Sequence, residues 1–312
     1  MALFRKQRKA AHEDHPAPLF DEAFQRQLEG LALVTRRMAS GRDKAERKAH
    51  RSAGGIAFAE HRPYVAGDDF RFLDWKVFAR SDRLLLKQFE EQSDLMVHVM
   101  LDCSGSMSEA GPVGGASPKF DHAKRIAAAL GYVALANLDR VGVQAFADGL
   151  DERLPPLRGK SRALRLLRFL EKLPSAGRTD FARAAKTFAA REAARGLCLV
   201  ITDGYDFAGL TQGLDALRYA RLEPVLLLVM DPGELTPPLQ GEWLLVDCES
   251  SDERSVTVTS GLLARYREAH RRHFDVLRAH CREKRVRCFE VPVNVAFDHA
   301  VLSLLKQGGL LG

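Results

Sequence analysis

Three oxygen-bearing side chains alternate along one short segment of the chain. Asp102, Ser104 and Ser106 stand at every second position, and Gly105 between the two serines lets the backbone turn tightly. A carboxylate and two hydroxyls in such a turn can face one point, and they are hard oxygen ligands of the kind that Mg²⁺ or Mn²⁺ prefers. The segment therefore predicts a site for a divalent cation.

A site of this kind leaves some coordination positions of the ion free for water or for another ligand. Mg²⁺ usually keeps several of its waters, and an ion held mainly by neutral hydroxyls keeps much of its positive charge. It can therefore accept a carboxylate from another molecule. This chemistry favours metal-dependent binding of a protein partner.

Two buried strands are expected to end beside this site. Leu95 to Leu101 is a continuous apolar run followed by Asp102, and Leu197 to Thr202 is a second run followed by Asp203. Strands and helices alternate after residue 92, which predicts an α/β fold with a doubly wound, mostly parallel sheet. Ligands of such sheets bind beyond the carboxyl ends of the strands, so the topology places Asp102 and Asp203 together.

The other expected elements fit the same alternation. Helices are expected over residues 20–39, 120–134, 160–172, 180–192, up to about 220, 261–284 and 297–306. Further strands are expected over 141–147, near 154, and over 224–230, 243–246 and 286–293, and extended structure over 62–75 and 84–91. These patterns predict a flexible tail (1–18), an N-terminal appendage (19–92) and one α/β domain (93–312).

The oxygen-bearing motif resembles the metal-ion-dependent adhesion site of the von Willebrand A family, which uses a DxSxS sequence. That family also uses a threonine from a later loop and an aspartate after the fourth strand. Thr179, within Gly-Arg-Thr-Asp, and Asp203, within Ile-Thr-Asp-Gly, match these two positions. The resemblance implies a Rossmann-like von Willebrand A fold. It also implies a metal site made of Asp102, Ser104, Ser106, Thr179 and Asp203 that takes up a partner's carboxylate.

A second resemblance lies upstream. The stretch RPYVAGDDFRFLDWK (62–76), continued by Ala79-Arg80 and by Phe89-Glu90-Glu91, is similar to the signature of domain-of-unknown-function family 58. Members carry this segment just before a von Willebrand A-like domain. The two resemblances cover residues 57–206 well and the C-terminal part weakly. They imply a MoxR-type AAA+ ATPase, or its client, as the partner.

Other functions are weighed against this one. An aspartate at a strand end beside Mg²⁺ could serve a metal-dependent phosphohydrolase, but aspartyl phosphatases of the haloacid-dehalogenase type carry a second acid where this chain has Ser104. Arginine-rich stretches at 158–168 and 265–287 could bind nucleic acid, although their glutamates and apolar stripes favour solvated helix faces. The favoured interpretation is a non-enzymatic interaction module, an adaptor or chaperone, with no nucleic-acid partner.

Two further groups keep two interpretations each. His270, His273 and His280 share one face of an expected helix and could bind zinc, but a satisfied helix face is favoured. The Gly/Pro-rich stretch 111–118 is expected to border the metal site, either as a gate for the partner or as a disordered insertion.

Composition limits the setting. A net charge of +6 over 312 residues is modest, and five cysteines without a CxxC spacing argue against a disulfide framework. No apolar run approaches the roughly 20 residues that a membrane-spanning helix needs, and the N-terminus lacks the apolar stretch of a signal peptide. A cytoplasmic protein without a membrane span is expected.

Overall fold

The computed structural model describes residues 2–4, 19–41, 56–65, 68–91, 95–108, 119–192 and 195–308. The chain forms two compact units, one made of Met1–Gly41 with Met96–Gly312 and the other of Arg42–Leu95. The stretch 111–118, expected to border the metal site, lies outside the described residues.

The larger unit contains a six-stranded sheet in the order β11-β8-β7-β4-β5-β6. Its strands are β4 (Met96–Asp102), β5 (Arg140–Phe146), β6 (Leu150–Arg158), β7 (Leu197–Thr202), β8 (Glu223–Met230) and β11 (Arg287–Pro292). All neighbouring pairs are parallel except β5 and β6. Every residue of β4 and β7 is buried, as expected for strands covered on both faces. The predicted fold, a mostly parallel α/β sheet, is confirmed.

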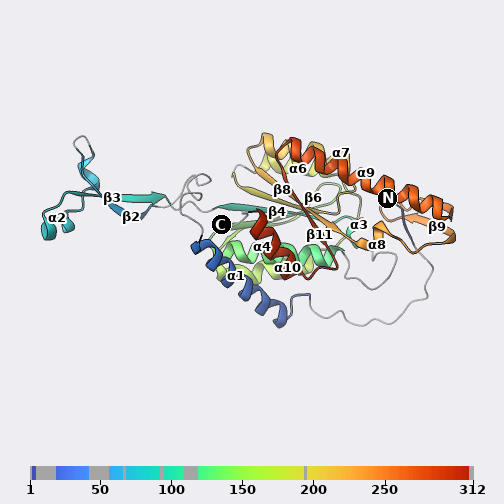
Figure 1. The fold of residues 1–312 in the computed structure, drawn as a ribbon, viewed down its shortest axis with the longest axis horizontal. Helices are drawn as coiled ribbons and strands as arrows, with labels where there is room; N and C mark the ends of the chain where they lie inside the picture. The colour runs from blue at the N-terminus through green and yellow to red at the C-terminus, as the bar shows by residue number, and fades with distance from the viewer. Residues whose placement is uncertain are drawn as a thin grey trace. The chain divides into compact units, whose positions relative to one another are not determined.

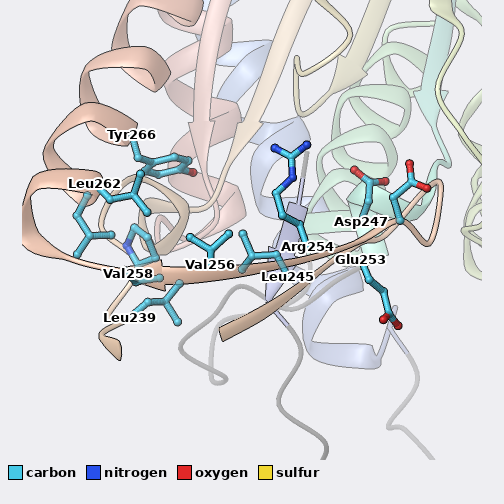
Figure 2. A pocket seen from close by; sticks show the side chains of 12 residues that line it. Leu239, Leu245, Asp247, Glu253, Arg254, Val256, Val258, Leu262 and Tyr266 are labelled. Atoms are coloured by element: carbon cyan, nitrogen blue, oxygen red, sulfur yellow. The ribbon is translucent and has the colours of Figure 1, made fainter. Parts of the chain in front are cut away.

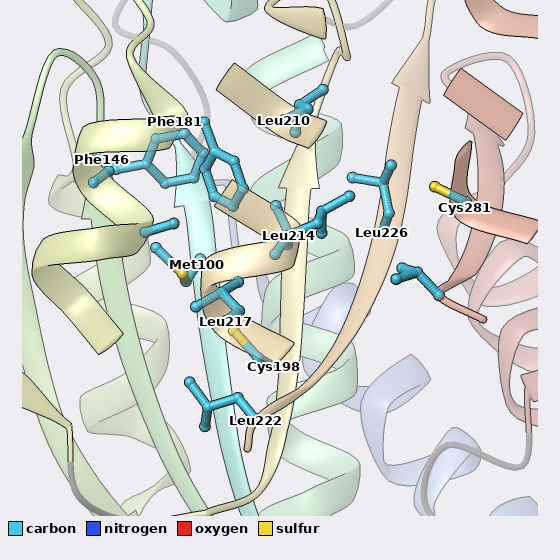
Figure 3. Packing of buried hydrophobic residues seen from close by; sticks show 14 of the residues in the cluster. Met100, Phe146, Phe181, Cys198, Leu210, Leu214, Leu217, Leu222, Leu226 and Cys281 are labelled. Atoms are coloured by element: carbon cyan, nitrogen blue, oxygen red, sulfur yellow. The ribbon is translucent and has the colours of Figure 1, made fainter. Parts of the chain in front are cut away.

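Helices cover both faces of this sheet (Figure 1). On one side lie α1 (Glu22–Gly41), α4 (Lys119–Ala136), α5 (Ala163–Lys172) and α10 (Phe297–Gly308). On the other lie α6 (Phe181–Arg191), α7 (Phe207–Tyr219) and α9 (Ser260–Glu283). Between the sheet and these last three helices, Phe146 and Phe181 pack at 5.1 Å between ring centroids in a core that includes Leu214 (Figure 3).

The N-terminal boundaries differ from those predicted. Helix α1, expected in the appendage (19–92), packs in the larger unit, where the rings of Phe24 and Phe297 lie 4.6 Å apart. At the start of the predicted tail, β1 (Ala2–Phe4) pairs with β9, and residues 5–18 lie outside the described part. The amphipathic helix α1 and the three-residue strand β1 both pack against distant parts of the chain, so local periodicity cannot assign them to a unit.

A smaller antiparallel sheet stands apart from the central one. Strands β9 (Gly241–Asp247) and β10 (Glu253–Val258) form a hairpin, and β1 adds to the other edge of β9. The predicted edge strand at 243–246 exists but belongs to this sheet, and β10 was not predicted. A single helical turn, α8 (Pro232–Leu235), precedes the hairpin.

The unit Arg42–Leu95 is built on a second hairpin, formed by β2 (Ile56–Pro63) and β3 (Leu85–Glu91). The extended structure predicted over 62–75 gives way after β2 to a 3₁₀ turn (Phe70–Phe72) and helix α2 (Trp75–Ser81). Aspartates cause this difference, because Asp69 and Asp74 accept backbone N–H groups at the starts of these two elements.

Asp206 links two helices of the larger unit. Its carboxylate accepts the N–H of Gly209 in the first turn of α7 (2.9 Å) and the N–H of Phe181 at the start of α6 (3.2 Å). We expect Asp206→Ala to lower the free energy of unfolding by about 1–2 kcal/mol, measured by urea denaturation. Asp215→Ala is the control, because that exposed carboxylate on α7 pairs only at the surface with Arg218, and its loss should stay below about 0.5 kcal/mol. Equal losses in the two variants would contradict the capping role.

Across the described ranges, no helix combines the length and the apolar character that a membrane span requires.

Candidate metal centre

Asp102 is the last residue of β4, and its carboxylate is fully buried. One oxygen accepts the N–H of Ser104 at 3.0 Å, and the other accepts the hydroxyl of Thr202, the last residue of β7, at 2.6 Å. From β4 the chain continues to β5 on one side, while β7 lies on the other side. The carboxylate therefore lies at the switch point of the sheet, where ligands of doubly wound folds bind.

The two serines of the motif lie directly beyond this strand end. Ser106 belongs to the short helix α3 (Gly105–Ser108), and its hydroxyl is 3.1 Å from that of Ser104. Both side chains are buried. The structure thus places a carboxylate and two hydroxyls on one turn.

The loop that carries Thr179 is held against this turn by three hydrogen bonds. Gly105 donates its N–H to the carbonyl of Gly177 (2.9 Å), Ala176 donates to the carbonyl of Cys103 (2.8 Å), and the Ser175 hydroxyl donates to the carbonyl of Ser104 (2.6 Å). Gly177 has a φ of +85°, which favours glycine at this bend. Thr179, half-buried, follows two residues later. Its loop is therefore part of the same edge.

Asp203 follows β7 and is also buried, but it has a cationic partner. The Lys119 ammonium, at the start of α4, lies 2.8 Å from the Asp203 carboxylate and 2.7 Å from that of Glu234. Glu234 in turn accepts the hydroxyl of Tyr205 at 2.8 Å. All three charged side chains are at most 4% exposed, so they form a buried ionic network beside the motif.

Glu249 brings another carboxylate to this edge. It lies between β9 and β10, and one of its oxygens accepts the Thr179 hydroxyl at 3.1 Å while the other accepts the Thr179 N–H at 3.3 Å. Thr179 is therefore hydrogen-bonded to the turn between β9 and β10.

The charges of this region favour a cation. Burial raises the pKa of Asp102 to about 7, and the negative charge of Asp203 acts in the same direction. Burial also raises the pKa of Glu234, against the opposing effect of Lys119. The Lys119 ammonium pairs with Asp203 and Glu234, so when these two carboxylates and that of Asp102 are all ionised, three negative charges stand against one positive charge, a formal excess of two. A divalent cation would neutralise this excess, and the hydroxyls supply the hard ligands that Mg²⁺ or Mn²⁺ takes. The donor set therefore fits such an ion.

Lys119, Glu234 and Glu249 were not found from the sequence. The position of Lys119 in the first turn of a helix is a local signal. A positive charge there is unfavourable beside the helix dipole, which suggests that an acidic side chain pairs with it. Glu234 and Glu249 reach the site through the fold from 31 and 46 residues beyond Asp203, and no local pattern marks them.

Two of the three histidines of α9, His270 and His273, make ordinary contacts. His270 Nε2 lies 3.3 Å from the Tyr205 hydroxyl, and His273 Nε2 lies 2.9 Å from the carbonyl of Gly204. Within the described ranges, these histidines belong to no group of three or more His, Cys, Asp or Glu that could hold a metal ion. His280 Nε2 is buried and, among the described residues, has no hydrogen-bond partner. The satisfied helix face is therefore supported at His270 and His273 and not at His280.

Fold and site together define an α/β protein with a mostly parallel sheet, whose switch point is lined by carboxyl and hydroxyl groups. The family model described as "Protein of unknown function DUF58" matches residues 60–276, and the chain belongs to this family. Uncharacterized proteins of Mycobacterium bovis and Mycobacterium tuberculosis are each 29% identical over 220 residues, covering 68% of this chain and 68% of the relative.

Similar solved structures include BatB, a conserved hypothetical protein from Bacteroides thetaiotaomicron (TM-score 0.43, 18% identity, 69% of this chain and 98% of that chain). An aerotolerance-related membrane protein from Bacteroides fragilis has a TM-score of 0.38 at 17% identity, covering 68% and 97% of the two chains. The manganese-loaded TRAP protein of Plasmodium vivax has a TM-score of 0.31 at 19% identity, covering 43% and 56%.

Proposed function

We propose that this protein is a non-enzymatic, divalent-metal-dependent protein-interaction module. Asp102, Ser104, Ser106, Thr179 and Asp203 would hold Mg²⁺ or Mn²⁺, and the ion would take a carboxylate from a protein partner. The supporting observation is that three segments far apart in the chain meet at one sheet edge that buries the carboxyl groups of Asp102 and Asp203 beside the hydroxyls of the serine motif. The ion would supply the charge that recognises a carboxylate, while this chain's residues orient the ion and exclude water from its inner side.

The partner class is proposed from the family. A MoxR-type AAA+ ATPase, or a client of that ATPase, is the partner that the upstream signature implies, and the chain belongs to the family that carries this signature. The module would then act as an adaptor or chaperone subunit, in keeping with a cytoplasmic protein that binds no nucleic acid.

Binding of the full chain to a MoxR-type ATPase from the same organism tests both parts of this proposal. We expect capture of the purified ATPase in Mg²⁺ and a loss of at least about tenfold in affinity in EDTA. Equal capture in EDTA would remove the metal from the proposal. No capture in either buffer, with Mn²⁺ binding to the chain intact, would remove the ATPase.

Thr179→Ala tests the contribution of the later loop. We expect Mn²⁺ affinity, measured by calorimetry, to fall by about 10-fold or more, because the variant loses an oxygen ligand at the edge of the site. The half-buried hydroxyl contributes little to packing, so the urea midpoint should change little. Thr187→Ala is the matched control, since that exposed hydroxyl only donates within α6 to the carbonyl of Arg183 (2.8 Å). Equal metal affinity in the two variants would count against Thr179.

A further inference from the structure

We infer that Glu249 is this chain's own carboxylate for the proposed metal ion, and that it occupies the open position which a partner's carboxylate would otherwise take. The inference rests on the proposed function. It adds a sixth ligand residue and a way in which the chain itself regulates access of the partner's carboxylate to the ion. In this arrangement the metal centre is closed by the β9–β10 hairpin until a partner's acidic group replaces Glu249.

The contacts of Glu249 place it on the metal-binding side of the edge. Both of its carboxylate oxygens face Thr179, one at 3.1 Å from the hydroxyl and one at 3.3 Å from the N–H. Thr179 is the outermost of the five proposed ligands, since it is half-buried while the other four are at most 4% exposed. A carboxylate on Thr179 therefore lies on the side from which a partner would approach.

The hairpin tip is built to present this carboxylate. The Asp247 side chain accepts the N–H groups of Glu249 and Ser250, each at 2.9 Å, and the Asp247 N–H donates to the carbonyl of Asp252 at 2.8 Å. These bonds close the turn and fix the backbone of Glu249. The two hydrogen bonds from Thr179 then hold the carboxylate at the end of the side chain.

The same tip closes over the serine motif. A Cβ added to Gly105 would lie 2.9 Å from the carbonyl oxygen of Cys248 and 3.4 Å from that of Gly177. Only glycine between Ser104 and Ser106 allows the hairpin and the Thr179 loop to come this close. The hairpin therefore covers the motif through its backbone as well as through Glu249.

The rest of the hairpin is loosely packed. A pocket of about 690 Å³ lies between the hairpin and α9, with Leu245, Val256 and Val258 on the hairpin side and Leu262 and Tyr266 on the helix side (Figure 2). Most hairpin residues are exposed or half-buried. Elements with few buried apolar contacts open at low free-energy cost. A partner's carboxylate could therefore displace the tip without unfolding the core.

The test compares Mn²⁺ binding by the full chain, Glu249→Gln and Glu253→Gln. The last is a matched control, because Glu253 lies on the same hairpin, is exposed and pairs through its backbone with Val246, away from Thr179. We expect Glu249→Gln to bind Mn²⁺ at least about 10-fold more weakly by calorimetry. We also expect its bound Mn²⁺ to relax water protons more strongly than in the unsubstituted chain, because the vacated position takes up water. Glu253→Gln should match the unsubstituted chain in both measurements.

The possible failures are distinguishable. If the unsubstituted chain binds Mn²⁺ but Glu249→Gln binds it equally or more tightly, or shows no added water relaxation, the role of Glu249 is overturned and the metal centre stands. If the unsubstituted chain binds no Mn²⁺, the proposed function is overturned and this inference with it.

Discussion

Replacement of Lys119 by methionine is expected to lower the free energy of unfolding by about 3–5 kcal/mol, measured by urea denaturation in EDTA. Removing one partner of a buried ion pair leaves an uncompensated buried charge, which is the costly case for such pairs. Here two carboxylates, Asp203 and Glu234, lose the same ammonium, which lies 2.8 Å and 2.7 Å from them. Methionine keeps an unbranched apolar stem like that of lysine and lacks the ammonium, so the loss reports mainly on the charge.

The pH range of this effect follows from the pKa of Lys119. Burial lowers the pKa of the ammonium, but the charges of Asp203 and Glu234 outweigh burial and raise it above its ordinary value of 10.5. A group with a raised pKa in the folded state contributes its full stabilisation below the unfolded pKa and loses it only as pH rises through the folded pKa. The unsubstituted chain should therefore keep this contribution throughout the neutral range.

Lys124→Met is the control for this prediction. Lys124 is another buried lysine of α4, but its ammonium donates to a neutral group, the carbonyl of Leu173, at 2.8 Å. Its replacement leaves one carbonyl unsatisfied, and we expect a loss of about 1–3 kcal/mol. Equal losses at the two positions would mean that the carboxylates beside Lys119 are not charged in the folded protein.

The elements that could be predicted well are those in which a local run of apolar residues indicates that the segment is buried. Both strands that end at the site are mainly apolar, with His98 the interruption in β4, and the strand–helix alternation predicts the parallel sheet in which they lie side by side. For this reason the amino-acid sequence alone is enough to expect Asp102 and Asp203 at one edge of the sheet.

What could not be predicted depends on contacts between distant residues. Strand β10 has the sequence ERSVTV, and its mostly exposed side chains leave only weak alternation to find. Lys119 lies 84 residues from Asp203, and Glu249 lies 70 residues from Thr179. These contacts are determined by how the helices and hairpins pack at the sheet edge. No local periodicity in the sequence indicates that packing.

Asp102→Asn should reverse the order of stability between the variant and the unsubstituted chain when Mn²⁺ is added. Burial, together with the charge of Asp203, raises the pKa of Asp102 to about 7 from 3.8. A carboxyl whose pKa is raised by folding opposes folding when it is ionised, so without metal its cost grows as pH rises from about 4 through 7. Asparagine removes this cost. It can still accept the Ser104 N–H and can donate to the Thr202 hydroxyl, the two groups that now bind the carboxylate.

In EDTA at pH 8 we therefore expect Asp102→Asn to unfold with a free energy about 1–3 kcal/mol above that of the unsubstituted chain. With Mn²⁺ at about 100 times its dissociation constant, the unsubstituted chain should gain about 2.7 kcal/mol, because the ion binds only the folded state. The variant should gain nothing, since its affinity for Mn²⁺ is expected to fall by at least about 100-fold.

Asp180→Asn is the matched control for this reversal. Asp180 follows Thr179, but its carboxylate caps α6 by accepting the N–H of Arg183 at 2.9 Å, a role that asparagine fills equally well. This variant should behave like the unsubstituted chain in both buffers. An equal gain from Mn²⁺ in Asp102→Asn would contradict the metal site. A loss of more than about 1 kcal/mol by that variant in EDTA would instead mean that Asp102 is a structural residue, because a carboxylate kept only for folding should stabilise the chain most when no ion is present.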